Sequence, residues 1–279
     1  MKQSIEAIRV IRKKRRSGKN ILMAAVIGWF LFLILFPLYG IIKEAFQTGF
    51  HLFVSSLITP ESRHSFLLTL WITTATVLIN TLFGVVLATV LVKQKFRGKL
   101  LFEGLVDLPF AISPVVAGFM FIILFGPQGW IGNWFESSGI KIIYAFPGML
   151  IATLFVTMPF VAREVIPVLR EFGIQQEEAA FVLGASRWQT FWRVTLPAIK
   201  WGLAYGVTLT IARSIGEFGA VLVVSGSIIR KTQTATLHIH QEFTDFNYVG
   251  AFSAAIVLAL ASFFILTLMQ RLYKRKEEK

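Results

Sequence analysis

The most constraining feature of the sequence is a series of long apolar blocks separated by polar segments. A helix needs about 20 predominantly apolar residues to cross a bilayer, and six blocks are close to that length. They cover residues 21–42, 66–92, 106–126, 144–161, 202–224 and 249–269. Hydrophobic residues make up 55% of the chain, which is too apolar for an ordinary soluble domain of this length. We therefore predict an all-α, polytopic membrane protein with about six transmembrane helices.

The first block follows a basic segment and so has the arrangement of a secretory signal. It is too long for one, and Phe36–Tyr39 provides no small-residue cleavage site. We expect a retained helix that is interrupted in sequence only by Gly28, Pro37 and Gly40. In the third block, Pro109 and Pro114 predict bends.

The distribution of basic residues predicts the orientation in the membrane, because short cytoplasmic loops retain Lys and Arg. Of the 28 Lys and Arg residues, 22 lie in the two tails and in the second and fourth loops between blocks. We therefore expect both termini to be cytoplasmic in a bacterial-type inner membrane. The predicted organisation is a basic tail (1–20), a transmembrane permease domain (21–270) with a cytoplasmic loop at about 163–200, and a second tail (271–279).

This one-sided charge also explains the net charge of +13 without nucleic-acid binding, and we expect no nucleic-acid partner. The chain has no cysteine, which excludes disulfides and thiolate metal sites. It also has no phosphate-binding loop of the Gly-x-x-x-x-Gly-Lys-Ser/Thr type, because Gly18-Lys19 lacks the first glycine and precedes Asn20. We predict no catalytic residue, so ATP hydrolysis in any ATP-driven process must come from another polypeptide.

The fourth loop is longer than a connection between two spans requires. Its first part contains Glu177 and Glu178, which suit a helix amino end, followed by Ala179 and Ala180. Gly184 is suited to ending that helix, and Pro197 to beginning the next one. Composition alone allows either a surface helix that docks a partner along its small residues or an amphipathic helix in the lipid headgroups.

The spacing in this loop resembles the signature of permease subunits of binding-protein-dependent ATP-binding-cassette importers. The matching residues are Glu178, Ala179, Ala180, Gly184, Val194, Leu196 and Pro197. The resemblance implies a type I importer permease fold and a coupling helix at Glu178–Gly184 that seats in a cleft of a separate ATPase. It assigns the coupling role to Glu178, Ala179, Ala180, Gly184, Ala185, Leu196 and Pro197. Movement of the ATPase clefts would then drive alternating access of the spans.

The fifth block contains two ionisable residues, Arg213 and Glu217. Each is costly at the bilayer centre, so both should face protein or water. A spacing of four places them on one helix face, where they can pair. The sequence leaves open whether they form a structural pair or lie in the translocation path, and Gly216 and Gly219 would allow a helix to approach closely.

The stretch Ala212–Ala220 resembles the same span in permeases for tetrahedral oxyanions. Val224–Ile228 and Asn247–Phe252 narrow the resemblance to the W-type permease of sulfate/thiosulfate importers. It implies as partners a homologous second permease, two ATPase subunits and an extracytoplasmic sulfate-binding protein. A molybdate or tungstate permease is the alternative within this class, and a stand-alone carrier or membrane enzyme is the alternative outside it.

No cluster in the sequence encodes a sulfate pocket, and neutral donors or helix amino ends can hold such a dianion. The candidates for the translocation path are Thr208, Arg213, Ser214 and Glu217. His238, His240 and Glu242 raise a metal hypothesis, but they fall at alternating spacing in an expected external loop, where two histidines with one carboxylate are usually incidental. We predict no metal and no cofactor on this chain, with ATP and Mg²⁺ bound by the partner ATPase.

Overall fold

The computed structural model describes the backbone of residues 2–277 and the side chains of residues 22–269 and Arg271. The side chains of the two predicted basic tails, 1–20 and most of 271–279, therefore lie outside the described residues. All regular elements in the described part are helices. They are α1 (Lys2–Phe46), α2 (Phe50–Ile58), α3 (Pro60–Lys93), α4 (Lys99–Ala111), α5 (Pro114–Phe125), α6 (Gly132–Ser137), α7 (Phe146–Phe172), α8 (Gln175–Val182), α9 (Arg187–Thr190), a π-helical segment (Phe191–Thr195), α10 (Leu196–Ile215), α11 (Gly219–Ser225), α12 (Ala235–Thr244) and α13 (Tyr248–Glu277).

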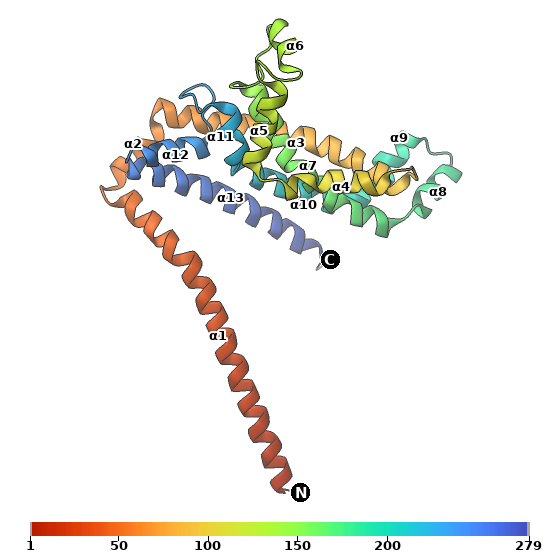
Figure 1. Ribbon diagram of the computed structural model, residues 1–279. Coiled ribbons are helices and arrows are strands. Elements are labelled where there is room, and N and C mark those ends of the chain that lie inside the picture. Colours follow the sequence, from red (N-terminus) through yellow and green to blue (C-terminus); the bar gives the residue numbers. More distant parts are fainter. Residues whose placement is uncertain (1, 278–279) are drawn as a thin grey trace.

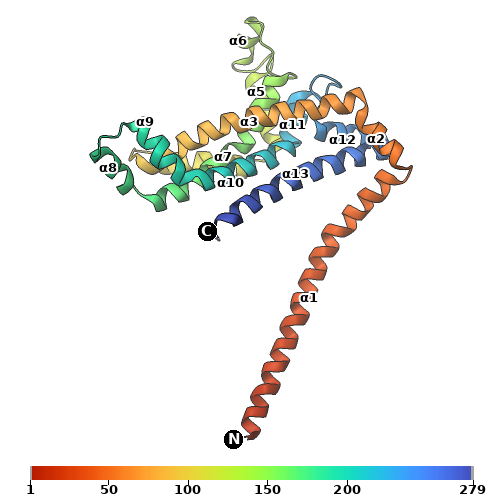
Figure 2. The same cartoon turned by 180° about the vertical axis from the view of Figure 1, so that it is seen from behind.

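The centre of the molecule is a bundle in which α3, α7, α10 and α13 run side by side (Figures 1 and 2). Small residues set the spacing of the first three. A Cβ on Gly84 of α3 would lie 2.7 Å from Val161 Cβ of α7, and one on Gly206 of α10 would lie 2.8 Å from Val161 Cα. Glycine therefore lets three helices meet around one valine, as is common in membrane bundles.

The interior of the bundle is polar as well as apolar. Buried hydroxyl groups lie along α3 and α7, at Thr69, Thr73, Thr76, Thr153 and Thr157. Asn80 of α3 donates hydrogen bonds to Thr157 Oγ1 (2.8 Å) and to the Leu154 carbonyl (3.2 Å) of α7. Large apolar side chains instead cover much of the outside. This inversion fits a bundle surrounded by lipid, where polar side chains join helices and apolar ones face the hydrocarbon.

Five helices are long and apolar enough to cross a membrane, and a bent pair gives a sixth if it counts as one span. The pair is α4 and α5, whose axes differ by 110°. Of the two predicted bends, the one at Pro114 is present but is a full break, because α4 ends at Ala111 and Pro114 is the first residue of α5. A proline lacks an N–H group and disfavours helix in the residue before it, so a new helix begins there. Pro109 instead lies inside α4.

The fifth predicted span is also not one helix, which corrects the expectation from the sequence. α10 ends at Ile215, and the short helix α11 begins at Gly219. Gly219 allows α5 to approach, since a Cβ there would lie 3.2 Å from Pro114 and Val115 side chains. An apolar block measured by hydropathy alone cannot reveal such a break, because both helices are apolar.

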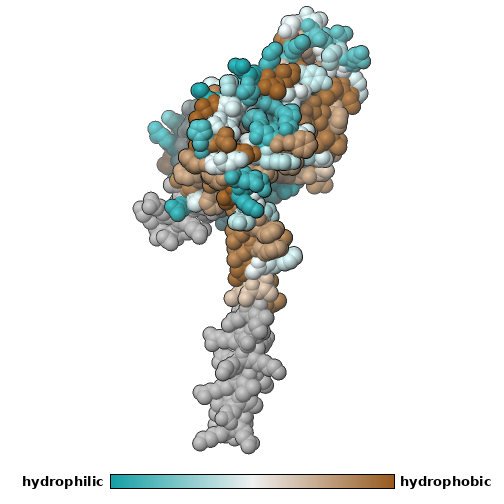
Figure 3. Space-filling view, turned by 90° about the vertical axis from the view of Figure 1, so that its left-hand side faces the viewer, coloured by the Kyte–Doolittle hydropathy of each residue, from teal (hydrophilic) through white to brown (hydrophobic). Residues whose placement is uncertain are grey.

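α1 differs from the other spans because it leaves the bundle (Figure 1). Its apolar part, Leu22–Phe46, has no buried residue in its most hydrophobic 18-residue window, and its later part contacts α13. In Figure 3 apolar residues cover α1 where it departs from the bundle, while polar residues gather on the end that faces the viewer. α1 thus depends on lipid or another chain to cover its surface.

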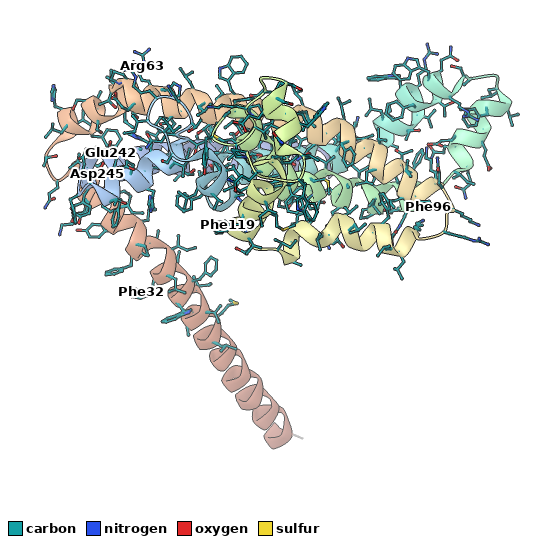
Figure 4. The ribbon with its side chains drawn as sticks, turned by 45° about the horizontal axis from the view of Figure 1, so that its top comes forward. Phe32, Arg63, Phe96, Phe119, Glu242 and Asp245 are labelled. Atoms are coloured by element: carbon teal, nitrogen blue, oxygen red, sulfur yellow. The ribbon has the colours of Figure 1, made fainter. Side chains whose placement is uncertain are left out.

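The two ends of the bundle carry different connections. Figure 4 places Arg63, Glu242 and Asp245 at one end and Phe96 at the other. The second end also carries α8 and α9 (Figure 1). The second and fourth loops, which the charge count assigned to one side, therefore lie at the same end.

Candidate functional site

The first candidate site is the segment around α8, at one end of the bundle (Figure 1). Ala179 and Ala180 favour helix, and Glu177 and Glu178 occupy the first turn, where the helix dipole stabilises acidic groups. The helix ends in a Schellman motif: the Gly184 N–H donates to the Phe181 carbonyl (2.9 Å) and the Ala185 N–H to the Ala180 carbonyl (3.0 Å). Gly184 has φ of +85°, a conformation that other residues adopt only with strain.

The outer surface of α8 is exposed and partly apolar. Val182 and Leu183 are each 87% exposed, and Phe181 is 45% exposed. No atom of the described residues lies within 4 Å of a Cβ built on Gly184. The placements of the predicted coupling residues are as follows: Glu178, Ala179, Gly184 and Pro197 are exposed, whereas Ala180, Ala185 and Leu196 are half-buried. Exposed apolar side chains beside a small residue can receive a partner.

The chain after Gly184 confirms one expectation and adds to it. Pro197 lies in the first turn of α10, as predicted, but helical chain already starts at Arg187 and continues through a π-helical segment to Ile215. Its start is a capping box, in which Ser186 Oγ accepts from the Gln189 N–H and Gln189 Oε1 accepts from the Ser186 N–H. A π-helical turn precedes Pro197. In a π-helical turn the backbone hydrogen bonds join residues five apart rather than four. This shift in hydrogen bonding accommodates Pro197, which has no N–H group to donate.

Sequence reasoning missed the role of Glu177, which it read only as an acidic residue at a helix start. Glu177 is buried, and its carboxylate accepts hydrogen bonds from Lys93 Nζ of α3 (2.5 and 2.6 Å) and Thr195 Oγ1 (2.5 Å). Lys93 is one of the basic residues of the second loop on which the predicted orientation rests. The sequence signals for this contact were a basic residue, Lys93, directly after an apolar block and two adjacent acids, Glu177 and Glu178. Because Lys93 and Glu177 are 84 positions apart, the sequence did not indicate that they pair.

The second candidate site is the break between α10 and α11. Arg213 Nη1 lies 2.7 Å from Glu217 Oε2, so the two residues form an ion pair. Glu217 lies beyond the end of α10, which corrects the view that both occupy one helix face. Its Oε1 accepts from the Ala220 N–H (2.9 Å), and its backbone carbonyl accepts from Thr236 Oγ1 (2.7 Å). The buried carboxylate thus ties α10 to the start of α11.

Ser214 and Thr208 do not share one environment. Ser214 is buried beside a cavity of about 10 Å³, room for roughly one water. Glu217, Thr69, Thr153 and Thr234 also line that cavity. Thr208 is buried too, and its hydroxyl donates to the Ala204 carbonyl (2.7 Å) in the same helix. It borders a groove of about 710 Å³ between α7, α10 and α13. The structure therefore separates these two predicted path residues.

The histidines of α12 do not converge with a third ligand. His238 Nδ1 is 3.9 Å from Glu242 Oε1, whereas the ring of His240 packs against Phe218 at a centroid distance of 5.3 Å. Across the described residues, no group of three or more His, Asp or Glu side chains is placed to hold a metal. Burial lowers the pKa of His238, because loss of hydration disfavours the protonated ring.

Comparison with known proteins decides the family. Residues 80–279 match the family described as binding-protein-dependent transport system inner membrane component. The chain belongs to this family of permeases. Its relatives are also named as permeases, which confirms the prediction of a permease subunit rather than an ATPase. The permease is accordingly a multi-pass membrane protein.

Three curated relatives are informative. The permease is 49% identical to the "Sulfate transport system permease protein CysW" of Synechocystis, over 92% of this chain and 93% of that one. Identity to the protein of the same name in Escherichia coli K12 is 44%, over 88% of this chain and 84% of the relative. The "Sulfate transport system permease protein CysT" of the same bacterium is 36% identical, over 87% of this chain and 88% of the relative.

The fold has a solved counterpart. A crystal structure of a bacterial ABC transporter that imports the acidic polysaccharide alginate contains a chain that aligns with a TM-score of 0.78. The alignment covers 94% of this permease and 96% of that chain at 20% identity. At this identity the likeness concerns the fold alone, and it confirms the predicted importer permease architecture.

Proposed function

We propose that this permease is the W-type membrane subunit of an ATP-driven importer for sulfate and thiosulfate. The observation that carries the proposal is its 44–49% identity to two W-type sulfate permeases over most of both chains. Identity to a T-type sulfate permease is lower, at 36%. This difference in sequence identity favours the W-type subunit over the T-type subunit as the assignment for this permease.

The proposal includes the remaining subunits. A homologous second permease, two ATPase subunits and an extracytoplasmic sulfate-binding protein would complete the transporter. The occurrence of both W-type and T-type relatives in one bacterium supports pairing with a sister chain rather than with a second copy. The excess of basic residues in the tails and alternate loops supports an inner-membrane orientation with both termini in the cytoplasm.

Within this assembly, α8 would be the coupling helix. Its exposed end at Val182–Gly184 is free of contacts on the Gly184 side, and glycine there lets a cleft wall approach closely. ATP and Mg²⁺ would bind the partner ATPase, and this chain would bind neither. Closure of the ATPase pair would move α8, and with it the spans, between inward-open and outward-open arrangements.

For the translocation path we retain Thr208 and Ser214 as candidates, and we assign Arg213 and Glu217 a structural role as an ion pair. Glu217 neutralises much of the attraction that Arg213 could exert on a dianion, and its carboxylate is engaged by the first turn of α11. Neutral donors would then contribute to holding sulfate as it passes.

Uptake of labelled sulfate tests the proposal, in cells that lack their own importer and express this chain with its partners. We expect uptake that requires this chain and the ATPase, and that excess thiosulfate blocks but modest molybdate does not. Block by molybdate or tungstate, with no sulfate uptake by the assembled complex, would move the assignment to a molybdate permease. Uptake without the ATPase would indicate a stand-alone carrier.

A further inference from the structure

The carboxylate of Glu177 lies where three elements meet. It belongs to the first turn of α8, it contacts the last residue of α3 through Lys93 Nζ (2.5 and 2.6 Å), and it contacts the π-helical segment before α10 through Thr195 Oγ1 (2.5 Å). Thr195 is buried, and the Glu177 side chain is only 10% exposed. One side chain therefore joins a peripheral helix to two membrane spans.

The charges at this junction suit their positions. Lys93 lies in the last turn of α3 and Glu177 in the first turn of α8, so each helix dipole stabilises the charge it meets. Hydrogen bonds between ionised partners are stronger than neutral ones. Loss of one partner from such a sheltered pair leaves the other charge uncompensated. Both charges are therefore needed to hold this junction together.

Unlike the junction at Glu177, the two ends of α8 are flanked by glycines with positive φ. Gly173 before it has φ of +70°, and Gly184 after it has φ of +85°. Both flanking joints therefore lie at glycines, the residue with the greatest backbone freedom. A force on the exposed end of α8 could turn the helix at these joints without moving α7 or α9. The contact with Lys93 and Thr195 is what would carry that force into α3 and α10.

Two other ion pairs at this end of the molecule provide a comparison. Arg163 of α7 contacts Asp107 of α4 (2.8 Å), and Arg170 contacts Glu103 of α4 (3.0 Å). Both are more exposed than the Glu177 pair, and both join α4 to α7. Among the ion pairs of the described residues, only the one at Glu177 includes α8.

We propose that Glu177 is a positioning residue for energy coupling, which transmits movement of α8 to α3 and α10 through Lys93 and Thr195. This inference rests on the proposed function, in which α8 contacts the ATPase. It goes further by separating two tasks among adjacent acids: Glu178 faces outward toward a partner, while Glu177 faces inward and fixes the helix to the spans.

The test uses the full complex with its second permease, ATPase subunits and binding protein in proteoliposomes. Sulfate transported per ATP hydrolysed is measured for wild type, Glu177→Gln, Lys93→Gln and the charge reversal Lys93→Glu with Glu177→Lys. We expect each single variant to lower this ratio by about 2- to 30-fold, the range for residues that carry coupling, while ATP hydrolysis continues. The reversal should restore part of the ratio, because it re-forms the ion pair while both helix dipoles then oppose its charges. Glu103→Gln, which breaks an ion pair away from α8, is the matched control and should keep the wild-type ratio.

A wild-type ratio in both single variants would overturn the inference, as would an equal loss in Glu103→Gln. If Glu177→Gln does not assemble, Lys93→Gln decides alone, because it retains the Glu177–Thr195 hydrogen bond. Failure of the proposed function looks different: the wild-type complex itself would then hydrolyse ATP without importing sulfate. A merely structural role would lower assembled protein and leave the ratio of the remaining complex unchanged.

Discussion

At the scale of single residues, Gly184 has two separate reasons to be glycine, and substitutions can distinguish them. Its φ of +85° is strained for other residues, at a cost of about 1–2 kcal/mol. Its open side is also where a partner would approach. We expect Gly184→Leu to insert into the membrane at normal levels and to abolish sulfate uptake, because the ATPase cannot seat against α8. Membrane quantification and labelled uptake measure both results.

Gly184→Asn serves as the matched variant, because asparagine tolerates the left-handed conformation but still adds bulk. Loss of uptake in both variants would show that close approach is required. Uptake by the asparagine variant alone would show that backbone conformation is the reason for glycine, and normal uptake by the leucine variant would remove the coupling assignment from this segment.

His238 of α12 gives the second prediction at this scale. Burial lowers its pKa despite the nearby carboxylates of Glu242 and Glu61. The unfolded chain therefore binds the proton first, so stability is complete above the ordinary pKa of about 6.5 and falls as the pH drops below it. We expect the Tm of the purified permease to decrease between about pH 7.5 and about pH 5.5. His238→Gln should weaken this dependence, whereas His240→Gln, an exposed position in the same helix, should retain it.

At the scale of elements, hydropathy predicted where apolar chain lies but not where helices end. The blocks containing α3, α7 and α13 are recovered because each lies within one helix, although α7 continues past the predicted end at residue 161 to Phe172. The breaks at Ile112–Ser113 and at Gly216–Phe218 were missed, or predicted only as bends, because contacts distant in sequence complete them: Thr236 Oγ1 donates to the Glu217 carbonyl at the second break, and Pro114 packs against Gly219. Likewise the Schellman end at Gly184 was predictable from local sequence, whereas the long-range contact of Glu177 was not.

The contact between α5 and α11 is the element-scale prediction. A Cβ on Gly118 would lie 2.7 Å from Val223 Cβ and 2.9 Å from the Ala220 carbonyl. We expect Gly118→Leu to destabilise the permease by about 1–3 kcal/mol, the usual cost of overpacking. Thermal unfolding in detergent measures this. Gly28→Leu on α1 is the control, because no atom of the described part of the chain lies within 4 Å of a Cβ there. An equal loss of Tm in this control would contradict the packing explanation.

At the scale of the whole molecule, the two ends of the bundle should face opposite sides of the membrane. Arg63 and Asp245 lie at one end, and the loop around Phe96 lies at the other with α8 and α9 (Figures 1 and 4). The charge distribution assigns the second end to the cytoplasm. The natural absence of cysteine makes this directly testable, because each introduced cysteine is then the only thiol.

We expect a membrane-impermeant maleimide to label Arg63→Cys and Asp245→Cys in intact cells. Lys95→Cys and Arg187→Cys should react only after the membrane is permeabilised, because their loops retain basic residues that are costly to translocate. All four native residues are exposed, so differences in labelling report the side of the membrane rather than burial. The reverse pattern would place α8 outside the cell, where no ATPase could reach it, and would therefore reject both the orientation and the coupling role of α8.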